Sequence, residues 1–306
     1  MSHEVESMFF VGETPWHGLG HHFIEPPKTL DEILPAAKLD WEVEANPIYS
    51  HEGKLIEGFK QLTRSDNGYS LSVVGSRYQP MQQRESFGAI MPLIESGEAE
   101  IETAGSLSNG KKVWALLRSN HLNETVLDNG ERVKNFFLWS TSHDSSRANR
   151  FGKTSVRVVC ANTLSMSDGD SAIKFRHTKN QVKILDTLVS FATDANQENE
   201  RLAQAYNMLL NSKIKHTELE QYITQVFDLK DTTRGKNLLN DIVGKAYWGK
   251  GNSEVKGTWW SALNAATEHL SHEAGRSAES RYQQLWFGAN QGLLNKATAL
   301  AIKAVS

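Results

Sequence analysis

The sequence predicts an α+β fold, with an antiparallel, strand-rich N-terminal half followed by a helical C-terminal half. The first observation behind this is hydrophobic alternation at period two, which recurs from residue 38 to about residue 165. The second is a single stretch with helical spacing inside that half, at residues 84–96. The third is a change to the 3.6-residue period from about residue 181 onward.

Three strands are predicted first, at residues 39–50, 53–64 and 69–75. Polar turns separate them, and the second turn ends in Asn-Gly, which is a strong hairpin signal. Residues 84–96 then carry apolar side chains on one helical face, and a kink is expected at Pro92. The strand-rich half therefore begins as a three-stranded meander followed by one helix.

About four more strands follow, at residues 99–107, 111–119, 132–142 and 153–164. Ser-Asn-Gly joins the first two, and a loop rich in Ser, Thr and Arg joins the last two. Antiparallel meanders of this kind bury one face on helices and leave the other face available.

The C-terminal half is predicted to consist of helices, with a Thr217–Glu220 capping box at the start of the second and a flexible loop at residues 248–257. The expected helices span 181–211, 216–227, 234–248, 258–274, 277–288 and 291–304. The domain interpretation is a core at 1–180 with an N-terminal arm, and a helical region at 181–306 packed on it. One single domain is the alternative, since no linker separates the two.

Composition excludes several classes of protein. The formal net charge of −3 argues against a chain that coats nucleic acid over its whole surface, so any polyanion site must be local. The single cysteine, Cys160, excludes an internal disulfide and is typical of a reducing cytoplasm. No apolar run is long enough to span a bilayer, and the N-terminus lacks the features of a signal peptide. A cytoplasmic protein without a membrane partner is expected.

The strongest candidate site is the basic segment 144–183, which holds eight Lys or Arg against three acids, a balance of +5. Guanidinium groups and hydroxyls are the groups that hold phosphate oxygens, and an aromatic ring can stack on an unpaired base. A solvated loop whose basic residues pair with acids elsewhere is the alternative. The predicted nucleic-acid-binding residues are Arg147, Arg150, Phe151, Lys153, Arg157, Lys174, Arg176 and Lys179.

Two other segments contain possible metal ligands. Residues 13–22 bring His17 and His21 close in sequence, but a structural arm anchored by Trp16 explains that segment more simply. Helical spacing in the second segment aligns Glu268 and His272 in a polar stripe.

That stripe also contains Asn264 and Arg276, and it is interpreted as a surface feature opposite a Trp260 face rather than as an acid–base or metal site. Cys160 lies in an apolar strand and is expected to be inert. Neither a nucleophile-elbow motif nor a phosphate-binding glycine loop is present. No catalytic residue and no cofactor is predicted, and a protein that is not an enzyme is favoured.

The sequence resembles the phage/plasmid-like family called domain of unknown function 932. Three segments carry the resemblance, in this order: GETPWHGLG (12–20), VRVVCANTL (156–164) and GTWWSALNAATEHLSH (257–272). The words YQPMQ (78–82) and HTKN (177–180) are also similar to that family. The resemblance covers nearly the whole chain and implies a bacteriophage or mobile-element origin. It supplies no catalytic residues.

At fold level, a core of three strands, one helix and more strands with a basic groove is similar to the single-strand annealing proteins of phage recombination. That similarity implies a homo-oligomer that holds single-stranded DNA on Arg and Lys side chains and leaves the bases free. Two alternatives stay open. One is a counter-defence protein that binds a host defence protein or a signalling nucleotide, and the other is a metal-dependent hydrolase or nuclease.

Overall fold

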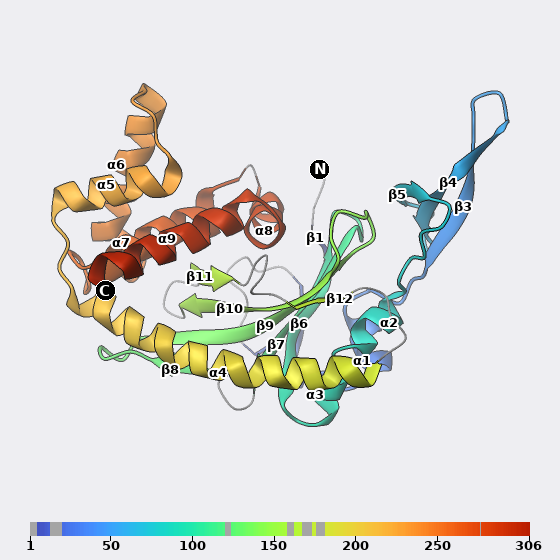
Figure 1. Cartoon of the computed structure of the whole chain (residues 1–306), viewed down its shortest axis with the longest axis horizontal. Helices are drawn as coiled ribbons and strands as arrows, with labels where there is room; N and C mark the ends of the chain where they lie inside the picture. The colour runs from blue at the N-terminus through green and yellow to red at the C-terminus, as the bar shows by residue number, and fades with distance from the viewer. Residues whose placement is uncertain are drawn as a thin grey trace. The chain divides into compact units, whose positions relative to one another are not determined.

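The computed structural model, shown in Figure 1, describes residues 5–12, 20–119, 124–157, 162–166, 173–175, 181–275 and 277–306. Trp16, His17, Cys160, Arg176, Lys179 and Arg276, for which the sequence made predictions, lie outside these residues. The chain forms two compact units, each built from three segments. The first unit comprises Met1–His121, Phe137–Gly152 and Ala172–Ala192, and the second comprises Leu122–Phe136, Lys153–Ser171 and Thr193–Ser306.

The first unit is built mainly from strands. Its helices are short: α1 (Leu30–Ala36), α2 (Gln83–Gly88) and α3 (Met91–Glu95). Its own strands are β1 (Val5–Val11), β2 (His21–Phe23), β3 (Val43–Tyr49), β4 (Leu55–Arg64), β5 (Ser70–Gly75), β6 (Ala99–Leu107), β7 (Lys112–Ser119) and β12 (Ile173–Phe175). Two long strands contribute to both units, β9 (Arg132–Ser142) and β10 (Asn149–Arg157).

The second unit is mainly helical, although β8 (Glu124–Val126) and β11 (Asn162–Met166) belong to it. Helix α4 (Gln181–Asn211) begins in the first unit and continues into the second. The remaining helices are α5 (His216–Phe227), α6 (Thr233–Trp248), α7 (Trp259–Glu268), the π-helix η1 (His269–Glu273), α8 (Ala278–Phe287) and α9 (Ala289–Val305).

Two sheets organise the strands of the first unit. In the larger sheet the order is β10-β9-β7-β6-β1-β2, with β12 beside β10. The smaller sheet is the antiparallel meander β3-β4-β5, and its β3–β4 hairpin extends away from the rest of the unit in Figure 1. Within the second unit, β10 lies between β11 and β9, and β8 pairs with β9.

Aromatic residues fill the first-unit core. Trp114, Trp139, Phe9 and Phe87 are almost completely buried, and Trp139 Nε1 donates a hydrogen bond of 3.2 Å to Ser86 Oγ. β1 and β6 approach so closely that a Cβ at residue 105 would lie 2.2 Å from a backbone oxygen of β1, so only glycine fits at this position.

The second-unit core surrounds α7, which is buried on nearly every side. Trp260, Leu263 and Asn264 are all 0% exposed. The Asn264 amide donates to the Trp260 carbonyl (2.8 Å), and Trp260 Nε1 donates to Glu131 Oε2 (3.0 Å). The predicted surface stripe at residues 264–276 is therefore wrong at its first residue, because α5, α6 and α9 enclose this helix.

The α+β class is confirmed, with strands concentrated in the N-terminal half and helices in the C-terminal half. The predicted helix 84–96 is instead two helices, and Pro92 lies in the first turn of α3, where the missing N–H is tolerated. The predicted strand 153–164 is corrected at its C-terminal end: residues 153–157 lie in β10 beside β9, as expected, but residues 162–164 belong to a separate strand, β11, which pairs with β10.

The expected capping box is displaced. The Glu218 carboxylate accepts from Lys215 N (2.8 Å), so the N-cap of α5 is Lys215, ahead of Thr217 in the chain. Among the described residues, no helix has the length and apolar character required to cross a membrane.

Candidate nucleic-acid interface

The turn that joins β9 to β10, with the strand ends beside it, carries two of the basic residues singled out by the sequence, Arg147 and Arg150. Residues 141–151 are called the basic hairpin below. Ser142 closes this turn from within, because its hydroxyl accepts from Arg147 N (3.0 Å) and donates to Arg147 O (2.9 Å). Asp144 Oδ1 accepts from Ser146 N (3.0 Å), and Ser145 adopts a φ of 60°. The turn therefore has a fixed backbone, and its only acidic side chain is partly engaged in holding it.

The base of the basic hairpin is anchored on the smaller sheet and on the segment before α2. His143, only 2% exposed, lies with its Nε2 2.9 Å from Gln83 Nε2. Trp41 packs edge-on against the His143 ring, with centroids 5.7 Å apart, and Ser72 Oγ donates to His143 O (2.9 Å). These contacts hold the base of the hairpin from three directions.

A second anchor lies one pair further along the hairpin. Asn149 is 3% exposed; its Oδ1 accepts from Thr141 Oγ1 (2.5 Å) and its amide contacts Met81 Sδ at 3.0 Å. Met81 and Gln83 both lie in or beside the YQPMQ word, so this segment acts as a brace for the hairpin. The sequence alone assigns no structural role to this segment, because its residues do not indicate which distant strand they contact.

Two guanidinium groups lie close together on this braced turn. Burial is the main cause that lowers the pKa of Arg147, and the positive charge of Arg150 lowers it further. The negative charge of Asp144 opposes both effects. Arg150 is itself partly buried, and its Nε is shielded from water without a hydrogen-bond partner among the described residues. Its backbone pairs in register with Lys174 of β12. The guanidinium groups of Arg147 and Arg150 repel each other, and an anion between them would relieve that repulsion.

Phe151 does not have the role that the sequence assigned to it. It is 0% exposed, its ring stacks on Phe137 with centroids 5.2 Å apart, and Phe191 of α4 packs edge-on at 5.6 Å. Successive strand residues point to opposite faces, so Phe151 faces the core while Arg150 faces away from it. The prediction that Phe151 stacks on a base is corrected on this ground.

The other predicted basic residues fall into two groups. Lys153 belongs to the second unit, alternation places it on the same strand face as Phe151, and its Nζ is buried, so the expected exposed phosphate contact is not supported. Arg157 ends β10 and Lys174 is in β12, but their side chains lie outside what the structure describes. Arg176 and Lys179 lie outside the described residues altogether.

The predicted metal candidates that the structure describes lie in both units. His21 is exposed in β2 of the first unit. Glu268 and His272 are partly buried in α7 and η1 of the second unit.

A different group in the second unit has metal-compatible spacing. The ligand atoms of Asp241, His269 and Glu273 lie within 4.8 Å of one another. Lys245 Nζ already bridges the two carboxylates, at 3.0 Å from Asp241 and 3.1 Å from Glu273. Burial alone would lower the pKa of Lys245, but these two hydrogen bonds outweigh burial and raise it. The group is thus an ion-pair network centred on an ammonium.

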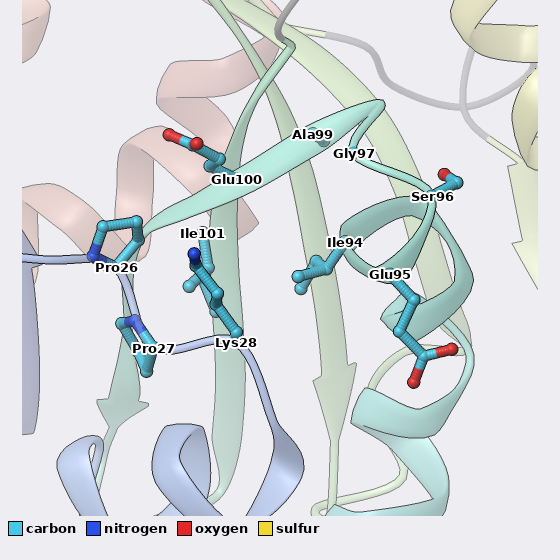
Figure 2. Close-up of a pocket in the computed structure, with 10 residues that line it drawn as sticks. All are labelled: Pro26, Pro27, Lys28, Ile94, Glu95, Ser96, Gly97, Ala99, Glu100 and Ile101. Carbon is cyan, nitrogen blue, oxygen red and sulfur yellow. The ribbon is translucent and has the colours of Figure 1, made fainter.

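One pocket of the first unit, shown in Figure 2, has a volume of about 340 Å³. Pro26 and Pro27 lie on one side of it and the segment from Ile94 on the other. Its charged lining is Lys28, Glu95 and Glu100, so carboxylates outnumber the single cation. A phosphate-bearing small molecule would be repelled there more than attracted, so this pocket does not favour the signalling-nucleotide alternative.

Comparison with known families adds one finding. A family model described as domain of unknown function (DUF932) matches residues 70–286, which is more than half of the chain. The match includes the brace, the basic hairpin and most of the second-unit helices. Among curated proteins and solved structures, no match to the chain was found.

Proposed function

The chain belongs to the family of domain of unknown function 932, and we propose that it binds the sugar–phosphate backbone of single-stranded nucleic acid through the basic hairpin. The observation that carries the proposal is the pair Arg147 and Arg150, two partly buried cations held close together on a braced turn. Their mutual repulsion is a cost that a bound phosphate would remove.

A phosphate between these groups would accept hydrogen bonds from guanidinium donors that face away from the core. Guanidinium is the side chain best suited to bidentate contact with phosphate. Because the brace fixes the turn beforehand, little ordering entropy would be lost on binding. The pair therefore fits a pre-organised phosphate contact.

The position of Phe151 indicates that the basic hairpin contacts the sugar–phosphate backbone of the strand and does not recognise its bases. Since this ring is in the core, the hairpin offers charge but no stacking surface. Contacts to phosphate carry no sequence information, and bases left free can pair with a second strand. Annealing of complementary strands is the activity that this arrangement favours.

The test is fluorescence anisotropy of a labelled 30-nucleotide single strand, titrated with the wild-type chain and with Arg147→Ala/Arg150→Ala. We expect the double variant to lose most of the affinity at low salt. The charge-matched control is Lys54→Ala/Lys60→Ala in the smaller sheet, which should bind as the wild type does.

Strand length separates the proposal from its competitor. Affinity that grows from a 5-nucleotide to a 30-nucleotide strand supports a backbone-binding protein, whereas equal displacement by a mononucleotide or cyclic dinucleotide would indicate a small phosphate ligand. Absence of binding to any single strand at low salt would overturn the proposal.

A further inference from the structure

Among the described residues of the second unit, Trp248 is the most exposed large apolar side chain. It is 79% exposed, whereas Trp114, Trp139 and Trp260 are 2% exposed or less. It ends α6 and begins the connection to α7, residues 249–257. Contact between water and so much indole surface is unfavourable, so a ligand that covers the Trp248 ring would be stabilised by its burial.

The connection after Trp248 is a built turn, although the sequence predicted a flexible loop. Asn252 is 0% exposed, and its amide donates to Lys245 O (3.0 Å) and to Ser261 O (3.3 Å). Val255 is 5% exposed and packs in the same core. The turn is therefore held on α6 and α7 from inside.

Gly249 explains how the turn lies so close to these helices. A Cβ there would lie 2.4 Å from Glu268 Oε2 and 2.5 Å from Lys245 O, so any other residue would displace the chain. The position of Trp248 is thus fixed by the backbone that follows it.

The turn carries two exposed lysines, one of which lies beside the indole. Lys256 Nζ lies 5.6 Å from the Trp248 ring centroid, and Lys250 is exposed two residues after Trp248. Neither lysine makes an ion pair with an acid in the part of the chain that the structure describes. By contrast, Lys245, which lies further back on α6, is committed to Asp241 and Glu273.

We infer that Trp248, Lys250 and Lys256 form a second contact for single-stranded nucleic acid, in which the indole stacks on an unpaired base and the lysines contact the adjoining phosphates. A planar ring with unpaired cations beside it matches a nucleotide, which presents a planar base and an anion together. An apolar protein surface would match the ring but would leave two lysines without a counter-charge. The inference rests on the proposed function, and adds to it the stacking group that the basic hairpin lacks.

The test compares a 30-nucleotide strand with a strand of the same length that carries abasic sites. Wild-type protein should bind the abasic strand about 5- to 150-fold more weakly, the range expected for loss of one base–aromatic stack. Trp248→Ala should show the same loss on the normal strand and no further loss on the abasic strand. Trp248→Phe should restore most of the affinity.

The lysines are tested by Lys250→Ala/Lys256→Ala, with Lys230→Ala/Lys236→Ala as the charge-matched control on the same unit. The first variant should bind more weakly and the control as the wild type does. All variants are first checked for an unchanged thermal unfolding midpoint, so that a loss of affinity reports on contact and not on folding.

The outcomes separate the two proposals. If Trp248→Ala binds like the wild type while Arg147→Ala/Arg150→Ala does not, the second contact is overturned and the basic hairpin stands. If Arg147→Ala/Arg150→Ala binds like the wild type while Trp248→Ala does not, the second contact is supported and the role of the basic hairpin is overturned. If the wild type binds no single strand, or Trp248→Phe fails to restore what Trp248→Ala loses, stacking on a base is overturned.

Discussion

Neighbouring residues of one strand can lie in opposite environments, and Arg150 and Phe151 of β10 are an example. Phe151 is enclosed by Phe137 and Phe191, while Arg150 lies on the other face of the strand and is partly buried. Alternation alone implies that both cannot contact the same ligand. Strand alternation separates the two side chains, whereas a local excess of basic residues does not distinguish the two faces of a strand.

Substitution of Phe151 should separate its core role from ligand binding. Phe151→Ala should lower the free energy of unfolding by about 3–5 kcal/mol, the usual cost of removing a buried ring. Phe151→Leu should cost less and should leave the affinity for a single strand unchanged. Chemical denaturation and anisotropy measure the two effects. A stable Phe151→Leu protein with strongly reduced affinity would restore the stacking role.

His269 makes a contribution to stability that depends on pH. Burial lowers the pKa of His269 from its ordinary value of 6.5; contacts with Glu273 and Asp241 oppose this shift, and the charge of Lys245 adds to it. As the pH falls through about 6.5, the unfolded chain takes up a proton that the folded chain resists, so stability declines until the folded pKa is reached.

His269→Gln should remove this component. Between about pH 7.5 and about pH 5.5 the wild type should lose more unfolding free energy than the variant does, as followed by urea denaturation. Phe227 packs edge-on against the His269 ring, so the difference in unfolding free energy at the higher pH reports the packing that the substitution removes. Equal losses in the two proteins would contradict the assignment.

At the scale of elements, helix ends show how local sequence determines structure. Thr258 begins α7: its Oγ1 accepts from Ser261 N (3.2 Å) and donates to Val255 O (2.6 Å). The first bond satisfies an orphan donor of the helix, and the second fixes the turn that carries the lysines beside Trp248. One hydroxyl therefore couples the start of α7 to the proposed second contact.

Thr258→Ala should lower the free energy of unfolding by about 1 kcal/mol, and Thr258→Ser should restore most of it. Because the Val255 carbonyl also loses its donor, affinity for a single strand should fall modestly in Thr258→Ala as well. Thermal unfolding and anisotropy with the same protein samples measure both. An alanine variant with wild-type stability would show that the cap is dispensable.

Elements with their own sequence pattern could be predicted, and elements that depend on a distant partner could not. The strands at 55–64 and 99–107 and the helix at 181–211 follow from alternation and helical spacing within each segment. β2, β8 and β12 have three residues each, too few for a pattern, and form only because a longer strand pairs with them.

The same reasoning applies to the candidate site. Arg147 and Arg150 could be found from composition, since basic residues were concentrated there. The brace at Met81 and Gln83 requires a contact across some 60 residues of chain, which a single sequence does not encode visibly. Trp248 is the last residue of the predicted helix 234–248, and periodicity cannot show that a helix ends where its core ends.

At the scale of the whole molecule, charge is arranged locally. The chain has a net charge of −3, yet Arg147 and Arg150 lie close together in the basic hairpin, and Lys250 and Lys256 lie in the Trp248 turn. Overall repulsion of a polyanion must therefore be overcome by a small number of close contacts. Binding of this kind should be weak at physiological salt unless several contacts act together.

Salt dependence measures how many contacts act. Each phosphate neutralised on a single strand contributes about 0.7 to the slope of log affinity against log salt, so four cations predict a slope of about −3. Arg147→Ala/Arg150→Ala and Lys250→Ala/Lys256→Ala should each make that slope shallower by about 1.4, and the combined variant by about twice as much. Anisotropy titrations at four salt concentrations give each slope.

If the two pairs bind one strand at once, a short strand that reaches only one contact should respond to one double variant and not to the other. A slope that either double variant leaves unchanged would remove that pair from the interface.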